Sequence, residues 1–300
     1  MNRHHRFNDQ TKPALLLVIP ALLGLLLFIL LPFVTALVLA FTDLRLGSPL
    51  ALRFVGFEQF LYILKDPDFT RALLNNLLFA AVVVPLQTAL ALALALLLNR
   101  GLPGTVAFRT LFFMPVVFPM SLVAVVWTLI YAPGPNGMMN AFLHWTSFGI
   151  WESRDFLRDP LLAMPAIMLL SIWQGVGFQM VILLAGLQGI PHALYEAAAL
   201  DGAGRWRQLL HITLPQLRNP LIFVMLVTTI LAFRLFDQVQ IMTRGGPENA
   251  TTTMIYETVQ AAFTRQQVAL ASAMTVVFFL LVLIVTWLQR RFTHQEREVT

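Results

Sequence analysis

The residues best placed to act together lie in a short polar segment between two long apolar runs. Glu196 is followed by three alanines, and Gly202 and Gly204 come soon after them. Alanine is the strongest helix former and adds little bulk, while glycine can end a helix in a left-handed conformation. Pro191 suits the first turn of such a helix, because its missing N–H would have no partner there. A small-residue helix with one anion suits docking into a groove of another protein.

The composition indicates that lipid surrounds much of the chain. Of the 300 residues, 58% are hydrophobic and 12% are charged, whereas a soluble domain usually carries about 25% charge. The sequence has no cysteine, which excludes disulfides, iron–sulfur clusters and Cys-ligated zinc, and we expect no metal site. The +5 charge comes from scattered arginines rather than from the clustered basic face that a nucleic-acid binder needs.

Uncharged runs mark the segments expected to cross the membrane, since a helix needs about 20 apolar residues to do so. We predict an all-α polytopic membrane protein with about six transmembrane helices. The first run is too long for a signal-peptide core, so we expect the N-terminus to be retained. The predicted transmembrane domain is 13–290, with tails at 1–12 and 291–300, spans near 14–41, 72–98, 108–131, 163–187, 216–236 and 266–289, and a polar loop at 189–215.

The distribution of Lys and Arg predicts the orientation. These residues are enriched in short cytoplasmic loops, and the two tails and the even-numbered loops carry them more densely than the other loops. Both termini and the 189–215 loop are therefore expected on the cytoplasmic side. In that loop a second amphipathic helix is predicted from Arg205 to Leu214, and Pro215 precedes the next span. The prediction is two short helices, nearly at right angles, beneath the membrane.

The spans contain no Asp, Glu, Lys or His near their centres. Proton relays and ion-coupled carriers usually need such a group, so a stand-alone ion- or proton-coupled secondary transporter is kept only as the alternative. The six histidines lie in loops and tails, where they cannot assist a membrane-embedded serine protease. The sequence also lacks the Gly-x-x-x-x-Gly-Lys-Ser/Thr phosphate loop. We therefore expect that the chain is not an enzyme and that any ATPase is a separate chain.

Three groups of residues in the polar loop form one spaced pattern: Glu196-Ala197-Ala198, Asp201-Gly202-Ala203 and Ile212-Thr213-Leu214-Pro215. This pattern resembles the cytoplasmic coupling motif of bacterial ABC import permeases. Further stretches are similar to the sugar and glycerol-phosphate (maltose-type) branch of that family: Phe54–Phe60 with Asp66-Pro67, Trp173 with Leu184–Gln188, and Gly245-Gly246-Pro247 with Thr251 and Thr253. The resemblance covers nearly the whole chain and points to the longer-looped member of an unlike permease pair.

The resemblance implies a permease subunit of a binding-protein-dependent importer for a sugar or sugar derivative. A second permease, two ATP-binding subunits and an extracytoplasmic solute-binding protein would be its partners in the bacterial inner membrane, with ATP and Mg held by the ATPase subunits and no cofactor on this chain. Glu196 would pair with a basic residue of an ATPase subunit. Ala197 and Ala198 would permit close approach, and Gly202 would allow the turn. Closure of the ATPases would tilt the permease helices and alternate access.

The resemblance also implies where the solute passes. In the maltose-importer relatives, residues of the fourth span and of the next one hold the solute. The matching positions here are Ser171, Gln174, Gly175, Phe178, Phe233, Arg234 and Asp237. The relatives have uncharged amides at the last two of these positions, so this chain departs from the pattern there.

Three interpretations of Arg234 and Asp237 stay open. The two residues are three apart and could pair on one helical face, or they could lie at the outer membrane surface, where arginine snorkels. Alternatively, Arg234 could bind an anionic solute such as a sugar carrying phosphate or sulfonate. Trp173 could stack on a sugar ring, although helix packing is favoured, and Asn75 and Asn76 are interpreted as helix–helix hydrogen-bonding groups rather than ligands.

Overall fold

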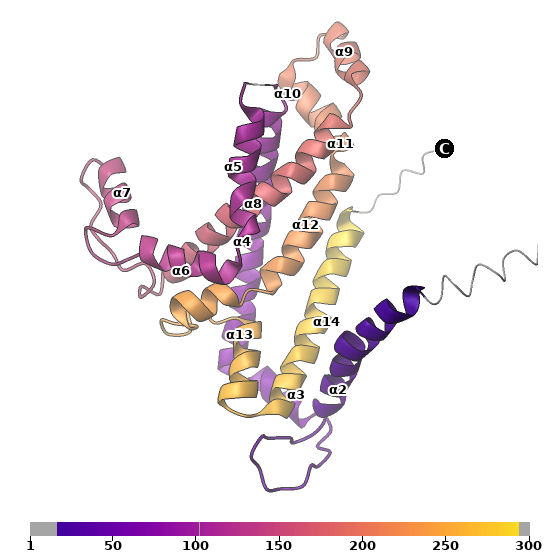
Figure 1. The fold of residues 1–300 in the computed structure, drawn as a ribbon, viewed down its shortest axis with the longest axis vertical. Coiled ribbons are helices and arrows are strands. Elements are labelled where there is room, and N and C mark those ends of the chain that lie inside the picture. The colour runs from indigo at the N-terminus through magenta and orange to yellow at the C-terminus, as the bar shows by residue number, and fades with distance from the viewer. Residues whose placement is uncertain (1–16, 102, 294–300) are drawn as a thin grey trace, which may run out of the picture. The chain divides into compact units, whose positions relative to one another are not determined.

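A computed structural model describes residues 17–101 and 103–293, which are mostly helical and contain no strand beyond one isolated bridge. Its helices confirm the predicted all-α membrane protein (Figure 1). Two bent helix pairs raise the number of candidate spans from 4 to 6 if each pair counts as one span. The predicted tail at 1–12 and the end of the chain after Thr293 lie outside the described residues. The four unbroken candidates are Leu17–Leu39, Pro67–Leu98, Ala163–Gln188 and Val268–Arg291.

The chain divides into two compact units. The first unit holds the described residues up to Asp66 together with Thr258–Phe279. Its loop after the first helix is hydrogen-bonded to the start of the last helix, since the Ala269 N–H donates to the Leu44 carbonyl at 3.0 Å. The elements of this unit are η1 (Leu26–Leu30), α2 (Leu31–Leu39), α3 (Glu58–Lys65), η4 (Gln260–Thr264) and the first part of α14 (Val268–Thr293).

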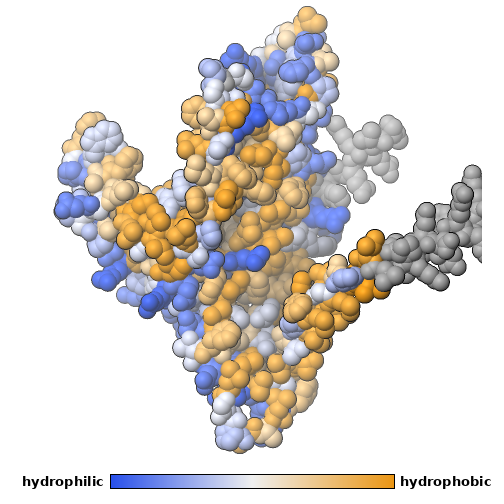
Figure 2. Space-filling view, in the orientation of Figure 1, coloured by the Kyte–Doolittle hydropathy of each residue, from blue (hydrophilic) through white to orange (hydrophobic). Residues whose placement is uncertain are grey.

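The second unit holds Pro67–Glu257 and the chain from Leu280 onward. Its central helix is α8, which packs against α4, α5 and α12 (Figure 1). Hydrophobic residues cover the middle of these helices, as Figure 2 shows, which is the surface expected to face lipid. The elements after α3 are α4 (Pro67–Leu98), α5 (Thr105–Val117), α6 (Met120–Ile130), α7 (Met138–Thr146), α8 (Ala163–Gln188), α9 (His192–Leu200), α10 (Arg205–Gln208), η2 (Leu209–Thr213), α11 (Leu214–Gln216), α12 (Arg218–Phe233), η3 (Val239–Thr243) and α13 (Met254–Val259).

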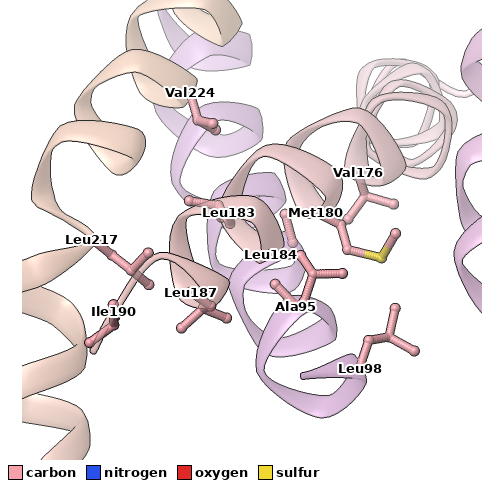
Figure 3. Close-up of a cluster of buried hydrophobic side chains, with 11 residues drawn as sticks. Ala95, Leu98, Val176, Met180, Leu183, Leu184, Leu187, Ile190, Leu217 and Val224 are labelled. Carbon is pink, nitrogen blue, oxygen red and sulfur yellow. The ribbon is translucent and has the colours of Figure 1, made fainter. Parts of the chain in front are cut away.

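One buried apolar cluster joins the ends of α4 and α8 to the start of α12. Side chains such as Ala95, Met180, Leu183 and Leu217, each 0% exposed, gather there (Figure 3). Lipid tails are as apolar as these side chains, so close packing rather than removal from water stabilises the contact. The cluster fixes the helix ends from which the polar loop emerges.

The predicted third span at 108–131 is not a continuous helix. It divides into α5 and α6, which meet at an angle of 100°. Phe118 has an extended backbone, with φ −81° and ψ 141°, and Pro119 follows it. The residue before a proline is disfavoured in the α-helical conformation, so the break occurs where the sequence favours it.

The fifth span also differs from the prediction, because α12 ends at Phe233 rather than near 236. Side chains satisfy the carbonyl groups beyond this end: the Asn76 amide donates to the Phe233 carbonyl at 3.4 Å, and the Thr253 hydroxyl donates to the Leu235 carbonyl at 2.8 Å. A helix can end inside a protein when its last carbonyls find such partners. The three residues after Phe233 are therefore not helical.

The second span begins at Pro67 instead of near 72. Proline is favoured in the first turn of a helix, and the first-turn carboxylate of Asp68 is favourable beside the positive end of the helix dipole. An uncharged run does not include this first turn of α4, because the turn contains Asp68 and Arg71. The fourth span was predicted at 163–187 and is observed as α8, Ala163–Gln188.

Candidate functional site

The helix that carries Glu196 is a free-standing helix, α9, at one end of the second unit (Figure 1). Pro191 takes the N-cap position just before it. The structure describes α9 in full and shows no buried residue in it. Leu200, its last residue, is 90% exposed.

The end of α9 is a defined turn. The Gly202 N–H donates to the Ala199 carbonyl at 3.1 Å, and the Ala203 N–H donates to the Ala198 carbonyl at 2.8 Å. This pair of bonds is the Schellman arrangement, in which the residue after the helix is left-handed. Gly202 has φ +74°, whereas Gly204 has φ −69°, so Gly202 is the residue that ends the helix.

Hydrogen bonds hold α9 against the segment that leads into α12. The Tyr195 hydroxyl lies 3.0 Å from the Thr213 hydroxyl, and the Gln208 side-chain amide donates to the Ala203 carbonyl at 3.1 Å. We call residues 191–216 the hairpin. These bonds connect the two arms of the hairpin.

The predicted coupling residues lie on the outside of this hairpin. Glu196, Ala197, Asp201, Gly202 and Pro215 are exposed, and Ala198, Ala203 and Leu214 are half-buried. Neither carboxylate forms an ion pair with any residue that the structure describes. The hairpin therefore carries Glu196 and Asp201 on its surface without an ion-pair partner in the described part of the chain.

The four predicted solute-path residues of α8 share one face, since Ser171, Gln174, Gly175 and Phe178 have helical i, i+3, i+4 and i+7 spacing. Ser171 accepts a hydrogen bond from the Gln238 amide at 3.3 Å. The Gln174 amide donates to the Phe118 carbonyl at 3.1 Å, at the break between α5 and α6.

Two of these α8 residues differ in how closely they are packed. A Cβ at Gly175 would lie 2.4 Å from the Gln87 amide nitrogen, so this glycine makes room for Gln87. Phe178 is 37% exposed and is the more open of the predicted solute-path residues on this helix. The sequence prediction missed Gln238 and the Phe118 carbonyl, although Pro119 signalled the break.

The three predicted solute-path residues that follow α8 in the sequence differ in their exposure. Phe233 is 0% exposed, while Arg234 and Asp237 are exposed. Because α12 ends at Phe233, the two charged residues do not share one continuous helix. They also form no ion pair with each other in the described ranges. The structure thus removes the interpretation that they simply neutralise each other.

The remaining polar candidates act as structural groups. The Trp173 ring packs edge-on against Trp127 with centroids 5.5 Å apart. The Asn75 amide donates to the carbonyls of Asn249 and Thr252 at 3.0 and 2.9 Å. Asn76 accepts the Met254 N–H at 2.8 Å in addition to its bond to α12. Residues 17–101 and 103–293 contain no cluster of three or more His, Asp or Glu that could hold a metal ion.

A family model described as "Binding-protein-dependent transport system inner membrane component" matches residues 87–297, more than half of the chain and including the entire hairpin. The chain belongs to this family. It is therefore an inner-membrane permease subunit of ABC importers, and membership in a family of transport subunits agrees with a non-enzymatic role. The alternative of a stand-alone secondary transporter finds no support.

Two characterised relatives align with most of the permease. The diacetylchitobiose uptake system permease protein of Streptomyces coelicolor is 37% identical over 84% of this chain and 73% of its own length. The sulfoquinovosyl glycerol transport system permease protein of Agrobacterium fabrum is 34% identical over 89% of this chain and 85% of its own. Both relatives belong to uptake or transport systems for sugar derivatives.

A solved structure has the same fold. It is a chain of a bacterial alginate ABC transporter in complex with alginate pentasaccharide-bound periplasmic protein. The superposition has a TM-score of 0.84 at 19% identity and covers 98% of each chain. At this identity the likeness establishes the fold alone.

Proposed function

We propose that this permease imports a sugar or sugar derivative, driven by separate ATPase subunits that dock on the hairpin. One observation carries the proposal: α9 is a small-residue helix without a buried residue that presents an unpaired carboxylate, Glu196, and is hydrogen-bonded to the segment leading into α12. Its attachment to the segment before α12 suits it to transmit movement.

Each hairpin residue has a role in this proposal. Glu196 pairs with a cation of the ATPase subunit, and Asp201 adds a second negative charge beside it. Ala197 and Ala198 let the partner approach the helix backbone. Gly202 and Ala203 form the turn, while Leu214 and Pro215 connect the hairpin to α12. ATP and Mg belong to the partner subunits.

The proposed assembly contains a second permease, two ATPase subunits and an extracytoplasmic solute-binding protein. The family description supports the binding protein. The bias of Lys and Arg supports cytoplasmic termini and a cytoplasmic hairpin. ATP-driven closure of the ATPases then pulls the two hairpins together and rocks the helices, which is a rigid-body route to alternating access.

The solute is proposed to pass Ser171, Gln174, Gly175 and Phe178 of α8 and to meet Arg234 or Asp237, with Phe233 forming the wall behind. The relatives' solutes, diacetylchitobiose and sulfoquinovosyl glycerol, favour a sugar derivative. Arg234 is exposed and has no carboxylate partner among the described residues. It is therefore available for an anionic group on the solute.

Uptake by right-side-out vesicles, or by proteoliposomes that enclose ATP and have the binding protein outside, tests both parts of the proposal when they contain the assembled importer. We expect uptake of sugars to require ATP and the binding protein and to be insensitive to proton and sodium gradients. We expect Arg234→Gln to lower uptake of anionic sugars about tenfold, because a hydrogen bond to a charged group is worth about 1.5–3 kcal/mol, and to spare neutral sugars.

The matched control is Arg71→Gln, which removes an exposed arginine at the start of α4. It should leave both classes of sugar unaffected. Uptake driven by an ion gradient without ATP would overturn the importer proposal. Equal uptake of anionic sugars by wild type and Arg234→Gln would overturn only the role of Arg234.

A further inference from the structure

A pocket of about 710 Å³ lies between the end of α4 and the hairpin. One wall is formed by Ala93, Leu96 and Leu97 on one face at the end of α4 and by Arg100 in the turn that follows. The facing wall comes from the hairpin and the end of α8. It consists of Leu187, Tyr195, Arg205, Trp206, Gln208, Leu209 and Thr213.

The charge in this pocket is uncompensated. Arg100 and Arg205 both line it and both are exposed. Neither forms an ion pair within the described parts of the chain. No carboxylate is among the residues that line the pocket. Two guanidinium groups thus face one cavity without an anion.

The other polar groups of the wall already have partners within the hairpin. The Tyr195 and Thr213 hydroxyls bond to each other, and the Gln208 amide donates to the Ala203 carbonyl. The donors left for a ligand are therefore the two guanidinium groups, the Asn99 side chain beside Arg100 and the Trp206 indole N–H. Guanidinium is the side-chain group whose planar donors fit the oxygens of a phosphate in a bidentate manner.

The pocket is apolar on one side and cationic on the other. Leu98 is the last residue of α4 and of its apolar stretch, and Arg100 lies only two positions later, about 3 Å further along at a helical rise. Trp206, on the rim, is 77% exposed, and tryptophan is enriched where a membrane meets water. These features place the pocket at the depth of lipid headgroups.

We propose that this pocket binds a phosphate ester, held by Arg100 and Arg205. A membrane phospholipid and a free phosphate compound share this chemistry. The lipid fits the apolar wall as well, since its acyl chains can lie along Leu96, Leu97 and Leu209 while its phosphate meets the arginines. The ligand touches both α4 and the hairpin, so its binding braces the hairpin against the membrane-spanning helices. This site is separate from the outward surface of α9 and does not depend on the solute or on the ATPase.

The test compares three single variants of the full-length chain, purified with whatever subunits accompany it. Arg100→Gln and Arg205→Gln remove the proposed ligands. Arg207→Gln is the matched control, because Arg207 is an exposed arginine two positions away that does not line the pocket. Each protein is placed in phosphatidylcholine nanodiscs with increasing phosphatidylglycerol, and retained phosphatidylglycerol is counted by native mass spectrometry. A parallel arm titrates inorganic phosphate in pure phosphatidylcholine.

We expect about fivefold weaker phosphatidylglycerol binding for Arg100→Gln and for Arg205→Gln, since one basic residue near an anionic membrane surface contributes about that factor. Arg207→Gln should bind as wild type. If inorganic phosphate binds with the same dependence on the two arginines and phosphatidylglycerol does not, the site takes a free phosphate compound. Equal losses in all three variants, or no loss in any, would overturn the site.

Discussion

Replacement of Glu196 by lysine is expected to abolish ATP-driven uptake while leaving the permease inserted and folded. The side chain is exposed on a helix with no buried residue, so the substitution breaks no contact within the chain. In the proposed complex it places a cation against the cation of the ATPase subunit. Disrupting a buried interfacial charge pair costs about 2–5 kcal/mol, so we expect at least about a tenfold loss of ATPase subunits retained on the purified permease.

Glu152→Lys provides the control, because Glu152 is also an exposed glutamate and lies in the segment between α7 and α8. It makes the same change of charge far along the chain from the hairpin. We expect normal retention of the ATPase subunits and normal uptake. Equal retention in wild type and Glu196→Lys would show that the glutamate is not part of the docking surface.

Replacement of Gly177 by alanine is expected to have the largest effect on folding. A Cβ at this position would lie 1.9 Å from the Phe112 carbonyl oxygen and 2.6 Å from its carbon. Both are backbone atoms of α5, which cannot turn aside as a flexible side chain could. Inserting one methyl group into a packed contact typically costs about 1–3 kcal/mol, and here α5 must move away from α8. We expect a loss of about 3 kcal/mol, measured as thermal unfolding of the detergent-purified permease.

Gly24→Ala is the matched helical control. In the described part of the chain no atom lies within 4 Å of a Cβ built at Gly24. Because alanine is the better helix former by about 1 kcal/mol, this variant should be as stable as wild type or slightly more so. If Gly177→Ala unfolds at the same temperature as Gly24→Ala, the close contact of α5 and α8 is not present in the folded protein.

The sequence predicted helix ends best where a single physical requirement determined them. The length of an uncharged run located α8 to within one residue, because the apolar stretch and the helix have nearly the same ends. It failed for α12, because the end at Phe233 depends on Asn76 and Thr253, which are far away in the sequence. The break after α5 could have been predicted from Pro119 alone, but hydropathy does not indicate it.

The candidate site also has some features that the sequence predicts and others that it does not. The helix, the glycine turn and the exposed carboxylate of the hairpin follow from local sequence, since Gly202 and the three alanines determine them. The bond between Tyr195 and Thr213 could not be predicted, because it closes across the turn. The pairing proposed for Arg234 and Asp237 assumed a continuous helix. That assumption does not hold, because α12 ends at Phe233, the residue before Arg234.

The most direct test of the central claim uses the absence of cysteine from this chain. A single thiol at Ala199→Cys, on exposed α9, or at Thr146→Cys, on exposed α7, can be labelled with a maleimide photo-crosslinker. Membranes containing the complete transporter are then irradiated, and the adducts are identified by mass spectrometry. Docking of the ATPase on the hairpin predicts an ATPase adduct from position 199 and none from position 146. No adduct from position 199, or equal adducts from both, would contradict it.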